Sequence, residues 1–139
     1  MISKSHITVR YAETDQMGIT HHSVYPVWYE VARTDFIKQV GMHYSEVEKA
    51  GVMMPLVSLD VKYMGYTKYE DELTVEVSIT KLTAARMEFE YKVYRNGGDK
   101  PVNIGHTAHA WTNREMRVIN LKKTHPEIYA IMEKAMQSV

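Results

Sequence analysis

The amino-acid sequence predicts an α+β fold, in which a five-stranded antiparallel sheet packs around one long central helix. Five segments alternate apolar and polar residues with the period of two that is typical of half-buried strands. Another segment, near the N-terminus, is apolar over most of a helical circumference, as expected of a buried helix. The predicted order of elements, β-α-α-β-β-β-β-α, also separates the helices from a run of strands. At 139 residues the chain has the length of one domain.

The first strand is predicted from the alternation of Ile7, Val9 and Tyr11 with polar neighbours. It should end at about residues 13–15. Gly18 then provides the conformational freedom of a tight loop.

Pro26 fixes where the long helix can begin. Proline has no backbone N–H, so it must lie at the cap or within the first turn, which places the cap between Ser23 and Pro26. Ser23 is the only good capping residue in that window. The helix should continue to about Val40 and end at Gly41.

The second half of the chain is predicted to hold most of the sheet. Ser45 and Glu48 have the spacing of a capping box, which indicates a short second helix ending at Gly51. Four strands follow, at about residues 57–63, 73–79, 87–93 and 102–112, and a tight turn at residues 96–99 joins the last two. His106 and His109 fall on opposite faces of the last strand. A C-terminal helix begins at residues 125–126, with one apolar face made by Ile128, Ile131, Met132 and Ala135.

Composition excludes several kinds of function. Without cysteine there can be no disulfide, no thiolate nucleophile and no Cys-ligated zinc. Basic and acidic residues number 17 each, so no net charge attracts nucleic acid or an anionic membrane. No apolar run is long enough to span a membrane, and the first residues lack the apolar stretch of a signal peptide. We therefore expect a cytoplasmic protein.

Residues 15–25 are the strongest candidate for a reaction centre, because a carboxylate loop runs directly into the long helix there. The backbone N–H groups around His22 and Ser23 lie at the positive end of the helix dipole and could stabilise an anion formed beside Asp15. The alternative is structural: Asp15 could simply close an Asx turn before Gly18. The residues alone do not decide between the two.

This stretch also resembles a known family. Asp15, Gly18, His22 and Tyr25 have the spacing of the opening motif of the hotdog-fold acyl-CoA thioesterases, specifically the 4-hydroxybenzoyl-CoA thioesterase and YbgC-like branch. The flanking segments 9–11, 28–30 and 32–33 fit the same pattern, and residues 69–73 look like the family's polar entry to its third strand. The order of the predicted elements fits over essentially the whole chain.

The resemblance implies a single hotdog thioesterase domain over residues 1–139, with the sheet wrapped around the central helix. It also implies at least a homodimer, and often a homotetramer, with sites at the subunit interface. The enzyme would hydrolyse an acyl-CoA to the free acid and CoA. It would need no metal and no cofactor, since CoA is part of the substrate.

The resemblance also assigns roles to individual residues. Asp15 would act as nucleophile or general base, and the His22 backbone N–H would polarise the carbonyl. The other expected substrate-binding residues are Gly18, Tyr25, Lys81, Thr83 and Arg86, the last three because relatives contact the nucleotide at this turn. Two structural alternatives stay open: Tyr25 could pack the helix on the sheet, and residues 81–86 could be an ordinary charged turn.

The sequence also offers three rival interpretations. Adjacent His21 and His22 could suggest a metal site, but histidines that are neighbours on an extended segment point apart. A non-catalytic acyl-CoA binding module is the main functional alternative, since a fold does not settle function. A hydratase or dehydratase is less favoured, because that chemistry usually uses a His and an acidic residue on the central helix, whereas His22 lies at its start.

Overall fold

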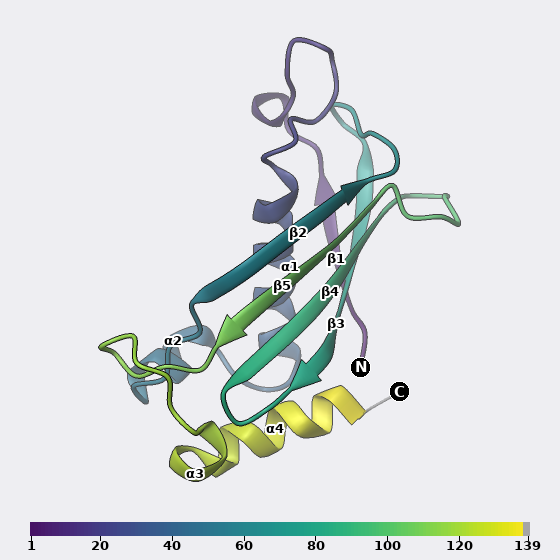
Figure 1. The fold of residues 1–139 in the computed structure, drawn as a ribbon. Coiled ribbons are helices and arrows are strands. Elements are labelled where there is room, and N and C mark those ends of the chain that lie inside the picture. The colour runs from purple at the N-terminus through teal and green to yellow at the C-terminus, as the bar shows by residue number, and fades with distance from the viewer. Residues whose placement is uncertain (138–139) are drawn as a thin grey trace.

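The structure, a computed structural model, describes residues 1–137 and contains one antiparallel sheet with helices packed on it (Figure 1). The strand order across the sheet is β1-β3-β4-β5-β2, and every neighbouring pair is antiparallel. This confirms the predicted five-stranded α+β architecture. In the described part of the chain, no helix is both long and apolar enough to cross a membrane.

The elements lie close to their predicted positions. The strands are β1 (Ser3–Thr8), β2 (Leu56–Tyr63), β3 (Glu72–Leu82), β4 (Arg86–Arg95) and β5 (Asn103–Ala110). The helices are α1 (Tyr25–Gln39), α2 (Tyr44–Lys49), α3 (Leu121–Thr124) and α4 (Pro126–Gln137), and a 3-10 turn, η1, covers Tyr11–Glu13. The short helix α3 was not predicted.

The predicted first strand was wrong at its C-terminal end. β1 stops at Thr8, and Tyr11 lies in η1 with 76% of its surface exposed. The side chain of Glu13 accepts a hydrogen bond from the Arg10 backbone N–H, at 2.8 Å between the heavy atoms. This contact curls the chain into a 3-10 turn, so the alternating pattern does not continue as a strand.

Two predicted helix caps were also wrong. The N-cap of α1 is Val24, which lies inside the predicted window but provides no side-chain cap. The Ser23 hydroxyl lies 2.7 Å from the Nδ1 atom of His21 instead. α2 begins at Tyr44 after His43, so Ser45 lies inside the helix and caps nothing.

α1 lies on one face of the sheet and packs against β1 and β3 (Figure 1). Its side chain Tyr29 reaches across to β4 and β5, where its ring stacks on Tyr91 with centroids 4.4 Å apart and planes 11° apart. The Tyr29 hydroxyl donates to the side-chain oxygen of Asn103. On the other side of α1, Val27 and Val31 are 53% and 40% exposed, so this chain alone does not enclose the helix.

Gly105 allows this close approach of α1. A Cβ atom added at Gly105 would overlap the ring and hydroxyl of Tyr29, and Tyr91 prevents the ring from moving away. We therefore expect Gly105→Ala to lower the free energy of unfolding by about 1–3 kcal/mol, the usual cost of overpacking a core. Denaturant titration would measure it. The same change in a Tyr29→Leu background should cost clearly less, and an equal cost in both backgrounds would contradict the steric explanation.

A chain of buried hydrogen bonds connects α1 to the start of β2. The Arg33 guanidinium donates to the Tyr91 hydroxyl (3.0 Å), which lies 2.7 Å from the Thr107 hydroxyl. Thr107 in turn lies 2.9 Å from Nε2 of His109, whose Nδ1 lies 3.2 Å from the Met54 carbonyl oxygen. Because a guanidinium only donates, a carbonyl only accepts and a pKa of about 4 leaves the His109 ring neutral at pH 7, each proton in this hydrogen-bond chain points from Arg33 towards Met54. His109 is therefore the neutral tautomer that carries its proton on Nδ1.

His109 makes stability depend on pH. Burial, with a further contribution from the Arg33 cation, lowers its pKa from 6.5 to about 4. Below pH 6.5 the unfolded chain binds a proton at this position that the folded protein does not bind until about pH 4. The free energy of unfolding should therefore fall by up to about 3 kcal/mol as the pH drops through this window, with no loss above it.

Urea denaturation from pH 7 to pH 4, at fixed protein concentration, would check this. His109→Gln should flatten the pH dependence. His106→Gln is the matched control. Hydrogen bonds to Asp60 and Glu90 raise the pKa of His106 despite partial burial. Replacing His106 should therefore steepen the fall in the free energy of unfolding as the pH decreases. An unchanged slope in the His109 variant would contradict the assignment.

Candidate active site

The loop between β1 and α1, residues 9–24, carries the predicted reaction centre at one end of the sheet (Figure 1). The loop folds back on itself at Asp15. The Asp15 N–H donates to the Ile19 carbonyl and the Gly18 N–H donates to the Asp15 carbonyl, both at 2.9 Å. Gly18 has a φ angle of +82°, a conformation that L-amino acids rarely adopt, so glycine is required by the turn itself.

The Asp15 carboxylate makes one local contact. Its Oδ1 atom accepts the Met17 backbone N–H at 2.9 Å, which is the Asx turn of the structural alternative. Among the residues the structure describes, Oδ2 accepts no hydrogen bond, and the side chain is half-buried. The Asx turn therefore fixes the carboxylate through one oxygen and leaves the other available.

A cluster of hydroxyls holds the arm of the loop that returns to α1. The hydroxyls of Thr20 and Thr67 lie 2.6 Å apart, and the Tyr25 hydroxyl lies 3.0 Å from that of Thr67. The Thr20 N–H also donates to the Thr67 carbonyl at 2.8 Å. Tyr25 is buried, with its ring against Trp28 and Tyr63, so its position favours the packing role over direct contact with substrate.

Glu13 holds the other arm, and the sequence analysis did not identify it as a site residue. Its side chain is buried and accepts the indole N–H of Trp28 at 2.9 Å. One signal could have found it. Glu13 continues the odd-numbered series of Ile7, Val9 and Tyr11 that was predicted to face the core, and a carboxylate there needs buried donors.

The two histidines lie differently from the prediction. His21 and His22 are in a turn rather than an extended segment, and their rings lie side by side with centroids 4.1 Å apart. The Ser23 N–H donates to His21 Nδ1 at 3.2 Å, so it is not free as expected. The His22 N–H makes no hydrogen bond within the described chain, and the His22 carbonyl accepts the Tyr63 hydroxyl at 2.7 Å. Residues 1–137 hold no group of three or more His, Asp or Glu side chains arranged for a metal ion.

The predicted nucleotide-binding residues lie at the opposite end of the sheet from Asp15. Lys81, Thr83 and Arg86 surround the turn between β3 and β4, beside α4 (Figure 1). Lys81 and Arg86 both approach Glu88, with N–O distances of 4.0 and 3.1 Å, so part of their charge is neutralised. Within one chain, the structure does not bring this turn and Asp15 together.

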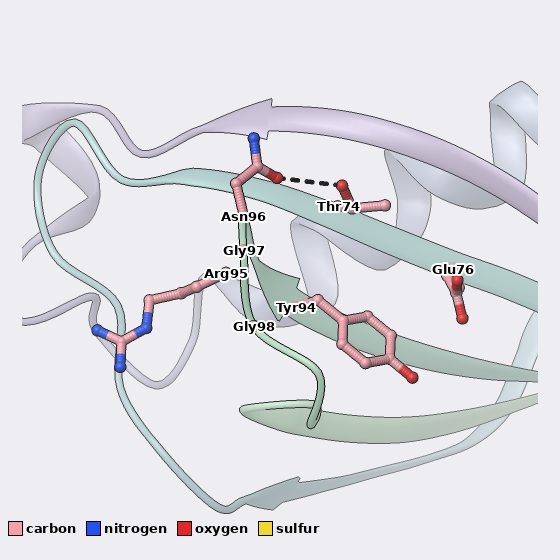
Figure 2. Close-up of a pocket in the computed structure, with 7 residues that line it drawn as sticks. All are labelled: Thr74, Glu76, Tyr94, Arg95, Asn96, Gly97 and Gly98. Carbon is pink, nitrogen blue, oxygen red and sulfur yellow. Dashed lines mark hydrogen bonds between the residues drawn. The ribbon is translucent and has the colours of Figure 1, made fainter.

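Two hollows open beside the turn between β4 and β5, with volumes of about 340 and 430 Å³, and Asp15 lines neither of them. Figure 2 shows the first, where Thr74 donates to the Asn96 side chain at 3.3 Å and Arg95 extends away from Glu76 and Tyr94. The Arg95 guanidinium lies over the ring of Tyr66 instead, 5.5 Å from its centroid. These hollows are shallow polar surface features, and no residue of the loop between β1 and α1 lines either of them.

An uncovered apolar strand lies next to the loop. β2 is an edge strand, and Leu56, Leu59 and Tyr63 are 51%, 42% and 48% exposed. Their partners on β5 are His109, Thr107 and Asn103, which face α1, so these three side chains project to the same side of the sheet as the helix. Tyr63 connects this strand to the loop through its hydrogen bond to His22.

Comparison with known proteins identifies the family. The family model described as thioesterase-like superfamily matches residues 9–134. The chain belongs to the thioesterase-like superfamily. YneP of Bacillus subtilis is 36% identical over 135 residues, which cover 96% of this chain and 97% of YneP. The acyl-CoA thioesterase YbgC of Haemophilus influenzae is 26% identical over 65% of this chain and 67% of its own.

Solved structures agree with this assignment. The DHNA-CoA thioesterase from Staphylococcus aureus has a TM-score of 0.90 and 30% identity, with 96% of this chain and 89% of that chain covered. Family and structure together confirm the resemblance to the hotdog thioesterases and the enzyme class, a thioester hydrolase.

Proposed function

We propose that this thioesterase-family protein hydrolyses an acyl-CoA to the free acid and CoA, with Asp15 at the centre of the reaction. The observation that carries the proposal is the geometry of Asp15: its loop leads into α1, its Oδ1 is fixed by the Met17 N–H, and its Oδ2 has no partner in residues 1–137. A carboxylate placed in this way can react without first breaking the turn that orients it.

Two routes lead to the same products. Asp15 can attack the thioester carbonyl, which breaks the C–S bond and gives a mixed anhydride that water then hydrolyses. It can instead take a proton from a water molecule, whose oxygen attacks the carbonyl; the C–S bond of the resulting tetrahedral intermediate then breaks and releases CoA as its thiolate. In both routes negative charge develops on the carbonyl oxygen. The His22 N–H, close to the positive end of α1, is the donor available to stabilise it.

The names of relatives support a CoA thioester as substrate. YbgC is named an acyl-CoA thioesterase, and the Staphylococcus aureus structure is that of a DHNA-CoA thioesterase. An activity screen should include aromatic as well as short and long aliphatic acyl-CoAs. The proposal treats residues 1–139 as one cytoplasmic hotdog domain, with CoA entering only as part of the substrate and with no metal or other cofactor.

Asp15→Asn tests the central role. Asparagine keeps an oxygen that can accept the Met17 N–H, so the turn should persist while the nucleophile or base is lost. We expect kcat to fall by at least about 100-fold, measured by release of free CoA thiol. Asp99→Asn, at an exposed position near the turn before β5, is the matched control and should leave kcat unchanged. If Asp15→Asn keeps most of its activity, Asp15 is only a turn residue. If the unmodified protein binds acyl-CoA tightly but leaves it intact, a binding module is supported instead.

The proposed site is completed by a second subunit. Asp15 is only half-buried, and the neighbouring edge strand β2 exposes a row of apolar side chains on the helix side of the sheet. A long apolar edge strand is a template for pairing with another chain. Two copies related by a two-fold axis would pair their β2 strands antiparallel, which joins the two sheets into one continuous sheet with both α1 helices on the same face and covers the approach to Asp15.

The same pairing accounts for the remote position of Lys81, Thr83 and Arg86. An antiparallel pair of β2 strands inverts one sheet relative to the other, so the β3–β4 turn of one protomer lies at the same end as Asp15 of its partner. The pantetheine arm of CoA separates the thioester from the nucleotide, so the nucleotide can extend towards such a turn. Val27 and Val31, exposed on α1, offer a further apolar surface through which two dimers can form the expected tetramer.

Leu59→Lys tests the assembly, because a lysine at an apolar interface would be buried without a partner. We expect this variant to be monomeric by size-exclusion chromatography with light scattering, and to lose at least about 10-fold in activity as the site loses its cover. Ser58→Lys places the same charge on the opposite face of the same strand and should stay dimeric. A dimeric, fully active Leu59→Lys variant would contradict the proposed interface.

A further inference from the structure

Glu13 is a buried carboxylate whose partners come from two different elements. It is 6% exposed. Its Oε1 accepts the Arg10 backbone N–H at 2.8 Å, and its Oε2 accepts the Trp28 indole N–H at 2.9 Å. The Arg10 guanidinium lies 3.5 Å from both oxygens and supplies a positive charge at the rim. Buried carboxylates persist only when they are paired in this way, so these contacts belong to the stable folded state.

The clamp between Glu13 and Trp28 joins the loop directly to the start of α1. Trp28 lies in the first turns of α1, is 2% exposed and packs its ring edge-to-face on Tyr25 with centroids 4.9 Å apart. It therefore has little freedom to move. A hydrogen bond from its indole nitrogen fixes Glu13 relative to the helix, and Asp15 follows Glu13 by two residues.

Glu13 also holds the opposite arm of the loop through its backbone. The Glu13 carbonyl accepts the His21 N–H at 2.9 Å. His22 follows directly, and its N–H is the proposed oxyanion donor. One residue is thus linked to both proposed catalytic groups: to the Asp15 carboxylate through two residues of chain, and to the His22 N–H through its hydrogen bond with the neighbouring His21.

We infer that Glu13 is a positioning residue, which sets the distance between the Asp15 carboxylate and the His22 N–H by locking both arms of the loop onto Trp28. This inference rests on the proposed function of Asp15. It assigns no contact with substrate to Glu13. If the clamp is broken, the hydroxyl cluster at Thr67 and the turn at Gly18 still hold the rest of the loop, so the fold should survive while the catalytic geometry loosens.

Two substitutions break the clamp from its two ends. In Glu13→Gln, the single amide oxygen can accept from Arg10 or from Trp28, and the amide NH₂ then faces the remaining donor. In Trp28→Phe, the indole N–H is lost and one carboxylate oxygen has no buried donor. For each variant we expect kcat to fall about 10-fold or more with KM changed by less than about three-fold, since misplaced catalytic groups affect the chemical step rather than ground-state binding.

The chain offers a matched control for each end. Trp111 is as buried as Trp28, but its indole N–H has no hydrogen-bond partner in the described structure, so Trp111→Phe removes the same atoms without breaking a clamp. Glu127→Gln makes the same acid-to-amide change on the exposed first turn of α4. Both controls should keep kcat close to that of the unmodified protein, whatever their cost in thermal stability.

The double variant Glu13→Gln/Trp28→Phe separates a clamp from two independent structural losses. Without the indole N–H, the glutamine amide no longer faces an opposing donor, and its oxygen can return to Arg10. The double variant should therefore be no slower than either single variant, whereas independent effects would multiply. Multiplicative losses, or single variants with unchanged kcat, would overturn the inference while leaving the proposed hydrolysis intact.

A second readout does not depend on turnover. Amide hydrogen exchange followed by nuclear magnetic resonance should show faster exchange at Met17 and His21 in both clamp variants, and unchanged exchange in the Trp111→Phe and Glu127→Gln controls. If the unmodified protein cleaves no thioester, the proposed function fails on its own, and the exchange rates still decide whether Glu13 holds the loop. Unchanged exchange at both amides would overturn that role.

Discussion

The position of α1 above the sheet depends on the contact between Tyr29 and Gly105. Because glycine has no side chain, the Tyr29 ring can lie against β5 with its face on Tyr91. Tyr25 lies one helical turn before Tyr29, so the same contact places the first turn of α1 over Thr67 and sets Trp28 beside Glu13. The geometry of the candidate active site is therefore fixed by the packing distance in the middle of the core.

Polar groups in the core add directional constraints that apolar packing lacks. Apolar side chains tolerate small sliding movements of a helix across a sheet, but a hydrogen-bond chain does not. The hydrogen-bond chain from Arg33 through Tyr91 and Thr107 to His109 is complete only when α1, β4 and β5 hold these relative positions. Its last bond, to the Met54 carbonyl, extends the same register to the segment that leads into β2. The core therefore orients the edge strand as well as the helix.

The sequence was sufficient where local physics decides the structure. Alternation placed β3 and β4, the proline restriction placed the start of α1 within a narrow window, and the sequence also indicated that Asp15 and Gly18 share one turn. It was misleading where several local solutions compete. Ser23 is a residue type that often caps helices, yet its hydroxyl pairs with His21. Tyr11 continues the alternating strand pattern, but the hydrogen bond from the Arg10 N–H to the Glu13 side chain turns the backbone into a 3-10 helix there.

The supporting residues of the site could not be predicted in the same way. Glu13 contacts Trp28 across fifteen positions, and Thr67 contacts Thr20 and Tyr25 across more than forty. Such contacts follow from the position of α1 on the sheet, which depends on Gly105, far away in the sequence. Local patterns thus identify the residue at the centre of a site more readily than the residues that hold it in place.

The proposed assembly and the proposed chemistry both depend on β2. In the sequence, its alternating apolar residues look like those of any half-buried strand, yet within residues 1–137 Leu56, Leu59 and Tyr63 stay 51%, 42% and 48% exposed. Tyr63 also donates to His22, so the exposed strand and the candidate oxyanion donor are parts of one surface. Efficient enzymatic hydrolysis needs an active site sheltered from bulk water, because the electrostatic stabilisation of the transition state weakens in a high dielectric. The element that would cover the apolar strand would shelter Asp15 as well, and a second copy presenting the same strand meets both requirements with one interface.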